Sequence, residues 1–171
     1  MAAAPYLYQG WGSPPNPATV MNATGVKWFT MAFILSSGYC DPMWDGSRPL
    51  TGGVDQQAIN TIRAYGGDVV VSAGGWSGSK LGENCNSAGK LAAAYQKAIN
   101  ALQLKAFDVD IEATEFGNAT LRQRSLQSKR RNVTRRSQAM RRCSAEGIGF
   151  ARIRGPEWRT DNLHRKKAGY L

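Results

Sequence analysis

Histidine is almost missing from this chain of 171 residues, since His164 is the only one and it lies in a strongly basic C-terminal segment. A Ser-His-Asp or Cys-His catalytic site within residues 1–118 is therefore excluded, and so is a histidine-ligated metal there. Cysteine is also scarce. Cys40, Cys85 and Cys143 show no Cys-x-x-Cys spacing, which argues against a zinc site. We therefore predict no metal site.

Two of the cysteines are placed so that they can be paired. Cys40 and Cys85 both lie in predicted loops rich in Gly, Asp and Asn, and we expect a disulfide between them, which leaves Cys143 over. Two free thiols are the alternative. A disulfide would favour an oxidising compartment, because such bonds persist outside the cytosol.

Long hydrophobic runs are absent, and none approaches the length of a membrane helix. The first five residues also lack the charged and apolar regions of a signal peptide. They resemble an initiator Met placed before an already mature secreted chain. We therefore expect an extracellular protein without a membrane partner.

Acidic residues are rare in the C-terminal segment, and this explains the formal net charge of +10. Residues 1–118 hold 7 Lys and Arg against 9 Asp and Glu, whereas residues 119–171 hold 15 against 3. The basic character belongs to the tail, whose few aromatics form no RNA-binding pattern, so it argues little for a nucleic-acid partner. The sequence gives no indication of the oligomeric state.

Apolar runs and helical stripes alternate along the first 112 residues. Strands are predicted at residues 6–12, 27–35, 68–72 and 106–112, with helices at 17–24, 55–65 and 88–104 between them. This order predicts an α/β fold with a parallel sheet covered by helices. The sheet can close as a (β/α)₈ barrel or stay open and doubly wound. No Gly-x-Gly-x-x-Gly follows the first strand, so we discount a dinucleotide-binding fold.

The last of these strands carries three acids. In residues 106–112, Asp108, Asp110 and Glu112 alternate with Phe107, Val109 and Ile111, which puts the acids on one face. On a parallel strand that face must line a barrel interior or a ligand crevice. Clustered carboxylates raise one another's pKa, and one can then stay protonated as a general acid. The alternative is the solvated face of an exposed strand.

Two motifs resemble the family 18 glycoside hydrolases, the chitinases. They are Ser-x-Gly-Gly at residues 72–75 and Asp-x-Asp-x-Glu at residues 108–112, one βα unit apart. The loop at residues 38–46 and the opening Tyr-Gln-Gly-Trp-Gly at residues 8–12 most resemble secreted bacterial chitinases. The resemblance covers residues 5–124. It implies a (β/α)₈ barrel of the TIM type, of which this chain holds the first half, about four βα units.

The resemblance also implies a substrate-assisted retaining mechanism on chitin or chitooligosaccharide, without a metal or organic cofactor. Glu112 would be the general acid that protonates the glycosidic oxygen. The acetamido oxygen of the substrate would attack, giving an oxazolinium intermediate. Asp110 would orient that acetamido group, and Asp108 would share a proton with Asp110.

Substrate-binding candidates lie at the predicted carboxyl ends of the strands. Trp11, Trp44 and Trp76 offer aromatic faces on which sugar rings stack, with core packing as the alternative for each. Ser72, Gly74 and Gly75 are counted with them, mainly because they keep the backbone close and leave room for the acids.

The chain departs from the family pattern in two places. Lys105 and Ala106 stand where the family has an acid and a glycine. Residues 125–171 are Arg-rich and match no part of the family, so we expect a first domain at 5–124 and a basic tail that arises from a shifted reading frame or a truncation, or is disordered. An inactive chitinase-like carbohydrate-binding protein is therefore the alternative function, because strands five to eight are missing.

Overall fold

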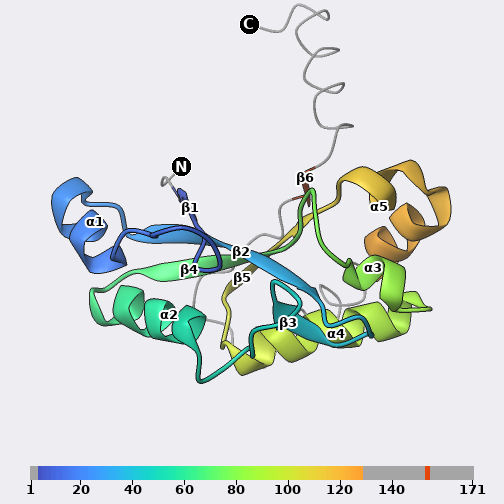
Figure 1. Ribbon diagram of the computed structural model, residues 1–171, viewed down its shortest axis with the longest axis horizontal. Coiled ribbons are helices and arrows are strands. Elements are labelled where there is room, and N and C mark those ends of the chain that lie inside the picture. The colour runs from blue at the N-terminus through green and yellow to red at the C-terminus, as the bar shows by residue number, and fades with distance from the viewer. Residues whose placement is uncertain (1–3, 129–152, 155–171) are drawn as a thin grey trace, which may run out of the picture.

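The computed structural model describes residues 4–128 and 153–154, and Figure 1 shows their arrangement. Strands and helices alternate along the chain as the sequence predicts. The elements are β1 (Tyr6–Leu7), α1 (Pro17–Thr24), β2 (Trp28–Ser36), β3 (Pro42–Trp44), α2 (Val54–Ala64), β4 (Asp68–Gly74), α3 (Leu81–Asn84), α4 (Ala88–Ala101), β5 (Ala106–Asp110), α5 (Ala113–Gly117) and β6 (Ile153–Arg154).

The strands form one sheet in the order β1-β2-β4-β5-β6, and each neighbouring pair is parallel. Only β3 is antiparallel, and it pairs with the end of β2. The consecutive order β1-β2-β4-β5 with intervening helices matches part of a TIM barrel. The predicted fold class is therefore confirmed.

Local sequence explains where the helices begin and end. Asn16 caps α1 by accepting a hydrogen bond from the N–H of Ala18, and Gly25 ends it in the left-handed region with φ 72°. Ser87 caps α4 in the same way through the N–H of Lys90. In Figure 1, α2 and α4 lie on the same side of the strands.

The core lies between that helical layer and the sheet. β2 is buried along nearly its whole length, as expected for a continuous apolar strand covered on both faces. On β5, the Phe107 ring contacts the Tyr95 ring of α4 with centroids 5.4 Å apart, so Phe107 faces the helices. Because side chains alternate along a strand, Asp108 and Asp110 face the opposite side.

The segment between β2 and α2 is more ordered than the long loop predicted for residues 36–53. Trp44 at the end of β3 is fully buried, and its indole N–H donates to the carbonyl of Leu50 at 3.3 Å. Arg48 then ties the segment to α2, because its guanidinium donates two hydrogen bonds to the buried Asp55 carboxylate at 2.9 and 3.0 Å. Burial of one large aromatic thus anchors the extra strand.

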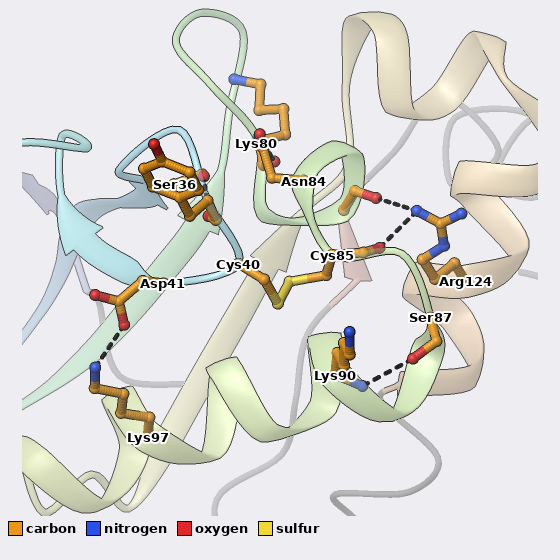
Figure 2. The surroundings of a disulfide bond; sticks show 12 residues. Ser36, Cys40, Asp41, Lys80, Asn84, Cys85, Ser87, Lys90, Lys97 and Arg124 are labelled. Carbon is orange, nitrogen blue, oxygen red and sulfur yellow. Dashed lines mark hydrogen bonds and ion pairs between the residues drawn. A yellow bond between two sulfur atoms is a disulfide. The ribbon is translucent and has the colours of Figure 1, made fainter.

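The predicted disulfide is present between Cys40 and Cys85, whose Cα atoms lie 4.6 Å apart. Figure 2 shows that it joins the loop after β2 to the residue that ends α3. An ion pair between Lys97 of α4 and Asp41 supports the same loop. Cys143 lies outside the described residues.

Beyond Glu112 the chain adds α5 and a further helical stretch at residues 119–128. Ser125 and Ser128 are buried, and Arg124 donates to the carbonyls of Gly82 and Cys85 at 2.9 and 2.6 Å (Figure 2). The expected boundary between residues 124 and 125 therefore falls inside a helix that packs on the body of the fold. The rest of the predicted tail lies outside the described residues, except β6, which pairs with β5.

Within residues 4–128 and 153–154, no helix is long and apolar enough to span a bilayer.

We predict that replacing both Cys40 and Cys85 by serine lowers the free energy of unfolding by about 4 kcal/mol, because the bond closes a loop spanning 45 residues. Urea unfolding of the oxidised wild type and the double variant measures the difference. The control is the reduced wild type, whose free energy of unfolding should fall by the same amount. Equal midpoints for all three proteins would contradict the prediction.

Candidate active site

Several of the predicted site residues meet where β4 and β5 run side by side. The register of this parallel pair sets Ser72 beside Asp108 and Gly74 beside Asp110. The side chains of Asp108 and Asp110 share the face of β5 that points away from α4. The structure therefore brings together the two motifs that the sequence separates by one βα unit.

Asp108 is held from the neighbouring strand. The Ser72 hydroxyl donates a hydrogen bond of 2.8 Å to Oδ2 of Asp108, and both residues are buried. A hydrogen bond to a buried carboxylate fixes its orientation and offsets part of its desolvation. Ser72 is fully covered by protein, and its place among the substrate-binding candidates stays a prediction. Its contact is with Asp108.

Asp110 lies where the two backbones come closest. The N–H of Gly75 donates to the carbonyl of Asp110 at 2.9 Å. Gly74 has φ 113°, and a Cβ there would lie 2.0 Å from the Asp110 carbonyl oxygen. A Cβ on Gly75 would meet the Phe33 ring at 2.9 Å. The two glycines therefore serve close approach of the strands, and their predicted contact with substrate remains a prediction.

Glu112 lies beyond β5, which ends at Asp110, so the expectation that all three acids belong to one strand is wrong at its last residue. The chain turns there because the Glu112 carbonyl accepts hydrogen bonds from the N–H groups of Glu115 and Phe116 at 3.1 and 3.4 Å, which begins α5. Glu112 is more exposed than Asp108 and Asp110. It is the acid nearest the carboxyl end of the strand, where barrel sites lie.

The aromatic candidates divide into exposed and buried residues. Trp11 after β1 is 82% exposed and Trp76 after β4 is 76% exposed, so both present their rings to solvent. Trp44 is fully buried, which agrees with the alternative of core packing, and its contact with sugar stays a prediction. Tyr39, 78% exposed after β2, was missed, although it follows a strand end just as Trp11 and Trp76 do.

A buried lysine and a buried glutamate lie beside the acids. Burial lowers the pKa of Lys80, and the charges of Glu115, Glu83, Glu112 and Asp110 act in the opposite direction, in that order of size. Burial raises the pKa of Glu115, which the charge of Lys80 only partly offsets. The Ser125 hydroxyl donates to Glu115 at 3.4 Å. Sequence reasoning missed both residues, since a lysine after a Gly-Ser loop carries no signal of burial.

Lys105, which replaces an acid of the family motif, lies at the other end of β5. Its ammonium is 3.3 Å from Oδ2 of Asp68 at the start of β4, and Arg63 donates to the other oxygen of that carboxylate at 2.9 Å. The departure therefore falls on the amino edge of the sheet and leaves the Asp-x-Asp-x-Glu residues in place. Within the described ranges, no group of three or more His, Cys, Asp or Glu is arranged to hold a metal ion.

Curated relatives match about three quarters of the chain. The Probable bifunctional chitinase/lysozyme of Escherichia coli (strain K12) is 30% identical over 130 residues, which cover 74% of this chain and 14% of that protein. Endochitinase 11 of Metarhizium anisopliae is 27% identical over 128 residues, covering 74% of this chain and 24% of that protein. The chain thus spans less than a quarter of these relatives. No protein-family model matches it.

Solved structures give the same result. Active domain 2 of a chitinase from Pyrococcus furiosus aligns with a TM-score of 0.67 and 30% identity over 78% of this chain and 43% of that one. A class V chitinase from Nicotiana tobaccum aligns with a TM-score of 0.60 over 86% of this chain and 43% of that one, and at 12% identity it shows the fold alone. These matches confirm the resemblance that the two motifs indicate.

We predict that Glu115→Gln removes a pH dependence of stability. The pKa of Glu115 is raised in the folded state above its ordinary 4.5, so its contribution is fully present below about pH 4.5 and is lost as the pH rises through the folded value. The free energy of unfolding of the wild type, relative to Glu115→Gln, should therefore fall between pH 4 and pH 7. Urea titrations across that range measure the difference. A difference that is constant with pH would contradict the assignment.

Proposed function

We propose, from the likeness of three quarters of this chain to part of a family 18 chitinase catalytic domain, that the protein hydrolyses β-1,4 linkages between N-acetylglucosamine units. The observation that carries the proposal is the arrangement at the carboxyl end of β5. Asp108 and Asp110 share one face there, and Glu112 follows at the mouth of the strand pair. This is the place where barrel enzymes keep their catalytic groups.

The proposed reaction begins with Glu112 in its protonated form. Its proton passes to the glycosidic oxygen as the bond from that oxygen to the anomeric carbon breaks. The acetamido oxygen of the same sugar forms the new bond to the anomeric carbon, which gives an oxazolinium ion. Water then attacks that carbon, the bond from the acetamido oxygen to it breaks, and the water gives its proton to the Glu112 carboxylate. The acid is thereby restored and the configuration is retained.

Asp110 and Asp108 support this sequence of events. The carboxylate of Asp110 orients the acetamido group and stabilises the positive charge that develops on its nitrogen. Asp108 lies one pleat deeper and shares a proton with Asp110. The Ser72 hydroxyl, at 2.8 Å from Asp108, holds that deeper carboxyl in place.

Exposed aromatic rings at the ends of neighbouring strands support chitin or chitooligosaccharide as the ligand. Trp11, Tyr39 and Trp76 follow β1, β2 and β4, which are adjacent in the sheet. Large aromatic faces that remain solvated in a folded protein are suited to the apolar faces of sugar rings. We propose that Trp11 and Trp76 bind substrate, with Tyr39 between them.

The Cys40–Cys85 disulfide supports an extracellular location, because such bonds are stable in oxidising compartments. A second candidate function is sugar binding without cleavage. It is favoured by the match covering only 43% of the solved Pyrococcus furiosus domain, while the chain still presents the exposed aromatics Trp11, Tyr39 and Trp76.

We predict that the full chain releases the fluorophore from a fluorogenic chitooligosaccharide and that Glu112→Gln lowers kcat about 10²–10⁴-fold, the usual value of a positioned general acid. Asp41→Asn is the control, since Asp41 is a partly exposed acid that pairs with Lys97 of α4 and takes no part in the proposed reaction. Wild-type rates in a folded Glu112→Gln protein would exclude the assignment. If the wild type binds the oligosaccharide but neither it nor the variants cleave it, the second function, sugar binding without cleavage, is the correct one.

We predict that Trp11→Ala and Trp76→Ala each weaken chitooligosaccharide binding about fivefold, since a stacked aromatic contributes about 1 kcal/mol. Isothermal titration calorimetry measures the affinity. Tyr65→Ala is the control, because Tyr65 is 46% exposed and precedes β4 at the amino edge of the sheet. Equal weakening by Tyr65→Ala would place the ligand elsewhere.

A further inference from the structure

Lys80 is a charged residue that the proposed reaction leaves without a role. It immediately precedes α3, and it is only 2% exposed. Figure 2 shows its side chain pointing away from the Cys40–Cys85 disulfide, toward the loop between β4 and α3. Burying an ammonium group costs free energy unless hydrogen bonds and opposite charges compensate. The surroundings of Lys80 supply both.

The hydrogen bonds go to the turn that follows β4. The Lys80 ammonium donates to the main-chain carbonyl of Ser77 and, at 3.5 Å, to that of Gly74. The two carbonyls bracket residues 74–77, so one cation closes the turn that carries the exposed Trp76. Main-chain carbonyls that lose contact with water need a donor, and the Lys80 ammonium donates to both of these.

The same turn is fixed on its other side by β5. Gly74 is the register partner of Asp110, and the N–H of Gly75 donates to the Asp110 carbonyl at 2.9 Å. Lys80 therefore contacts Gly74, and Asp110 contacts the next residue, Gly75. A displacement of the turn would move the strand end that carries this acid.

Charges around Lys80 come from three parts of the fold. Glu83 belongs to α3, Glu115 to α5, and Asp110 and Glu112 to the end of β5 and its extension. A positive charge near a carboxyl group favours the ionised form, and the effect is reciprocal between the two groups.

We propose that Lys80 is a positioning residue: its ammonium fixes the 74–77 turn against β5 and supplies positive charge to the carboxyl groups of Asp110 and Glu112. The roles of Asp110 and Glu112 rest on the proposed function, whereas the clamp and its charge are properties of the fold. Lys80 acts on the reaction through these acids and through Trp76, and it need not touch the sugar.

The first test compares Lys80→Gln, which can still donate to the two carbonyls but has no charge, with Lys80→Arg, which keeps the charge. NMR titration of the full chain labelled with ¹³C at Asp and Glu carboxyl groups gives their pKa values, assigned with Asp110→Asn and Glu112→Gln. We expect Lys80→Gln, which removes a nearby positive charge, to raise the pKa of Asp110, and Lys80→Arg to change it little. Lys90→Met, which removes an exposed charge from α4, is the control and should have no effect. Unchanged pKa values in a folded Lys80→Gln protein would overturn the proposal.

The second test needs no variant of Lys80. In the wild type labelled with ¹⁵N-lysine, removing either negative charge by Asp110→Asn or Glu112→Gln should lower the pKa of the Lys80 ammonium. An unchanged value in both variants would overturn the proposal even if Lys80→Gln does not fold. Where chitooligosaccharide is cleaved, Lys80→Gln should also lower kcat, and Lys80→Arg, which keeps the charge, should restore it. A wild type that folds but cleaves nothing contradicts the proposed function, and the two titrations still decide the role of Lys80.

Discussion

The close approach of two backbones at the carboxyl ends of β4 and β5 is the constraint on which the site depends. Only a residue without a side chain fits at Gly74, because the Asp110 carbonyl occupies the space of a Cβ. The approach fixes the register, and the register sets Ser72 against Asp108. The chain then enters the 74–77 turn, which carries Trp76 and accepts hydrogen bonds from Lys80. A single steric requirement therefore arranges groups from both strands.

Features that depend on periodicity could be predicted from the sequence. The apolar run of β2 predicts burial on both faces, and the stripe of α4 predicts which side of the helix is buried. The alternation of β5 separates the apolar residues that face the helices from the acids. The structure agrees with all three. The Ser-x-Gly-Gly and Asp-x-Asp-x-Glu motifs also indicated that β4 and β5 are neighbours. Local pattern and tertiary packing favour the same arrangement at these places.

Features that depend on packing between distant segments could not be predicted in this way. Nothing adjacent to Trp44 in the sequence says that Leu50 and the end of β2 enclose it, so the sequence leaves core packing and sugar binding both open for this aromatic. Lys80 follows a polar Gly-Ser loop that resembles any solvated connection. It precedes α3, on which residues 119–128 dock through Arg124, and no local pattern in the sequence predicts that contact. Long-range covering of polar side chains is the part that a single sequence leaves open.

The Cys40–Cys85 bond has a consequence for the chain under proteolysis. It closes a covalent ring that contains α2, β4 and the turn bearing Trp76. A single cut anywhere inside that ring opens it without releasing a fragment, so the part of the chain with β4 and β5 stays attached to the part with β1 and β2. The sheet order β1-β2-β4-β5 can then survive a nick that would otherwise separate the strands into two diffusing pieces. In a medium rich in proteases, the cross-link preserves the connectivity of the sheet as well as adding to its stability.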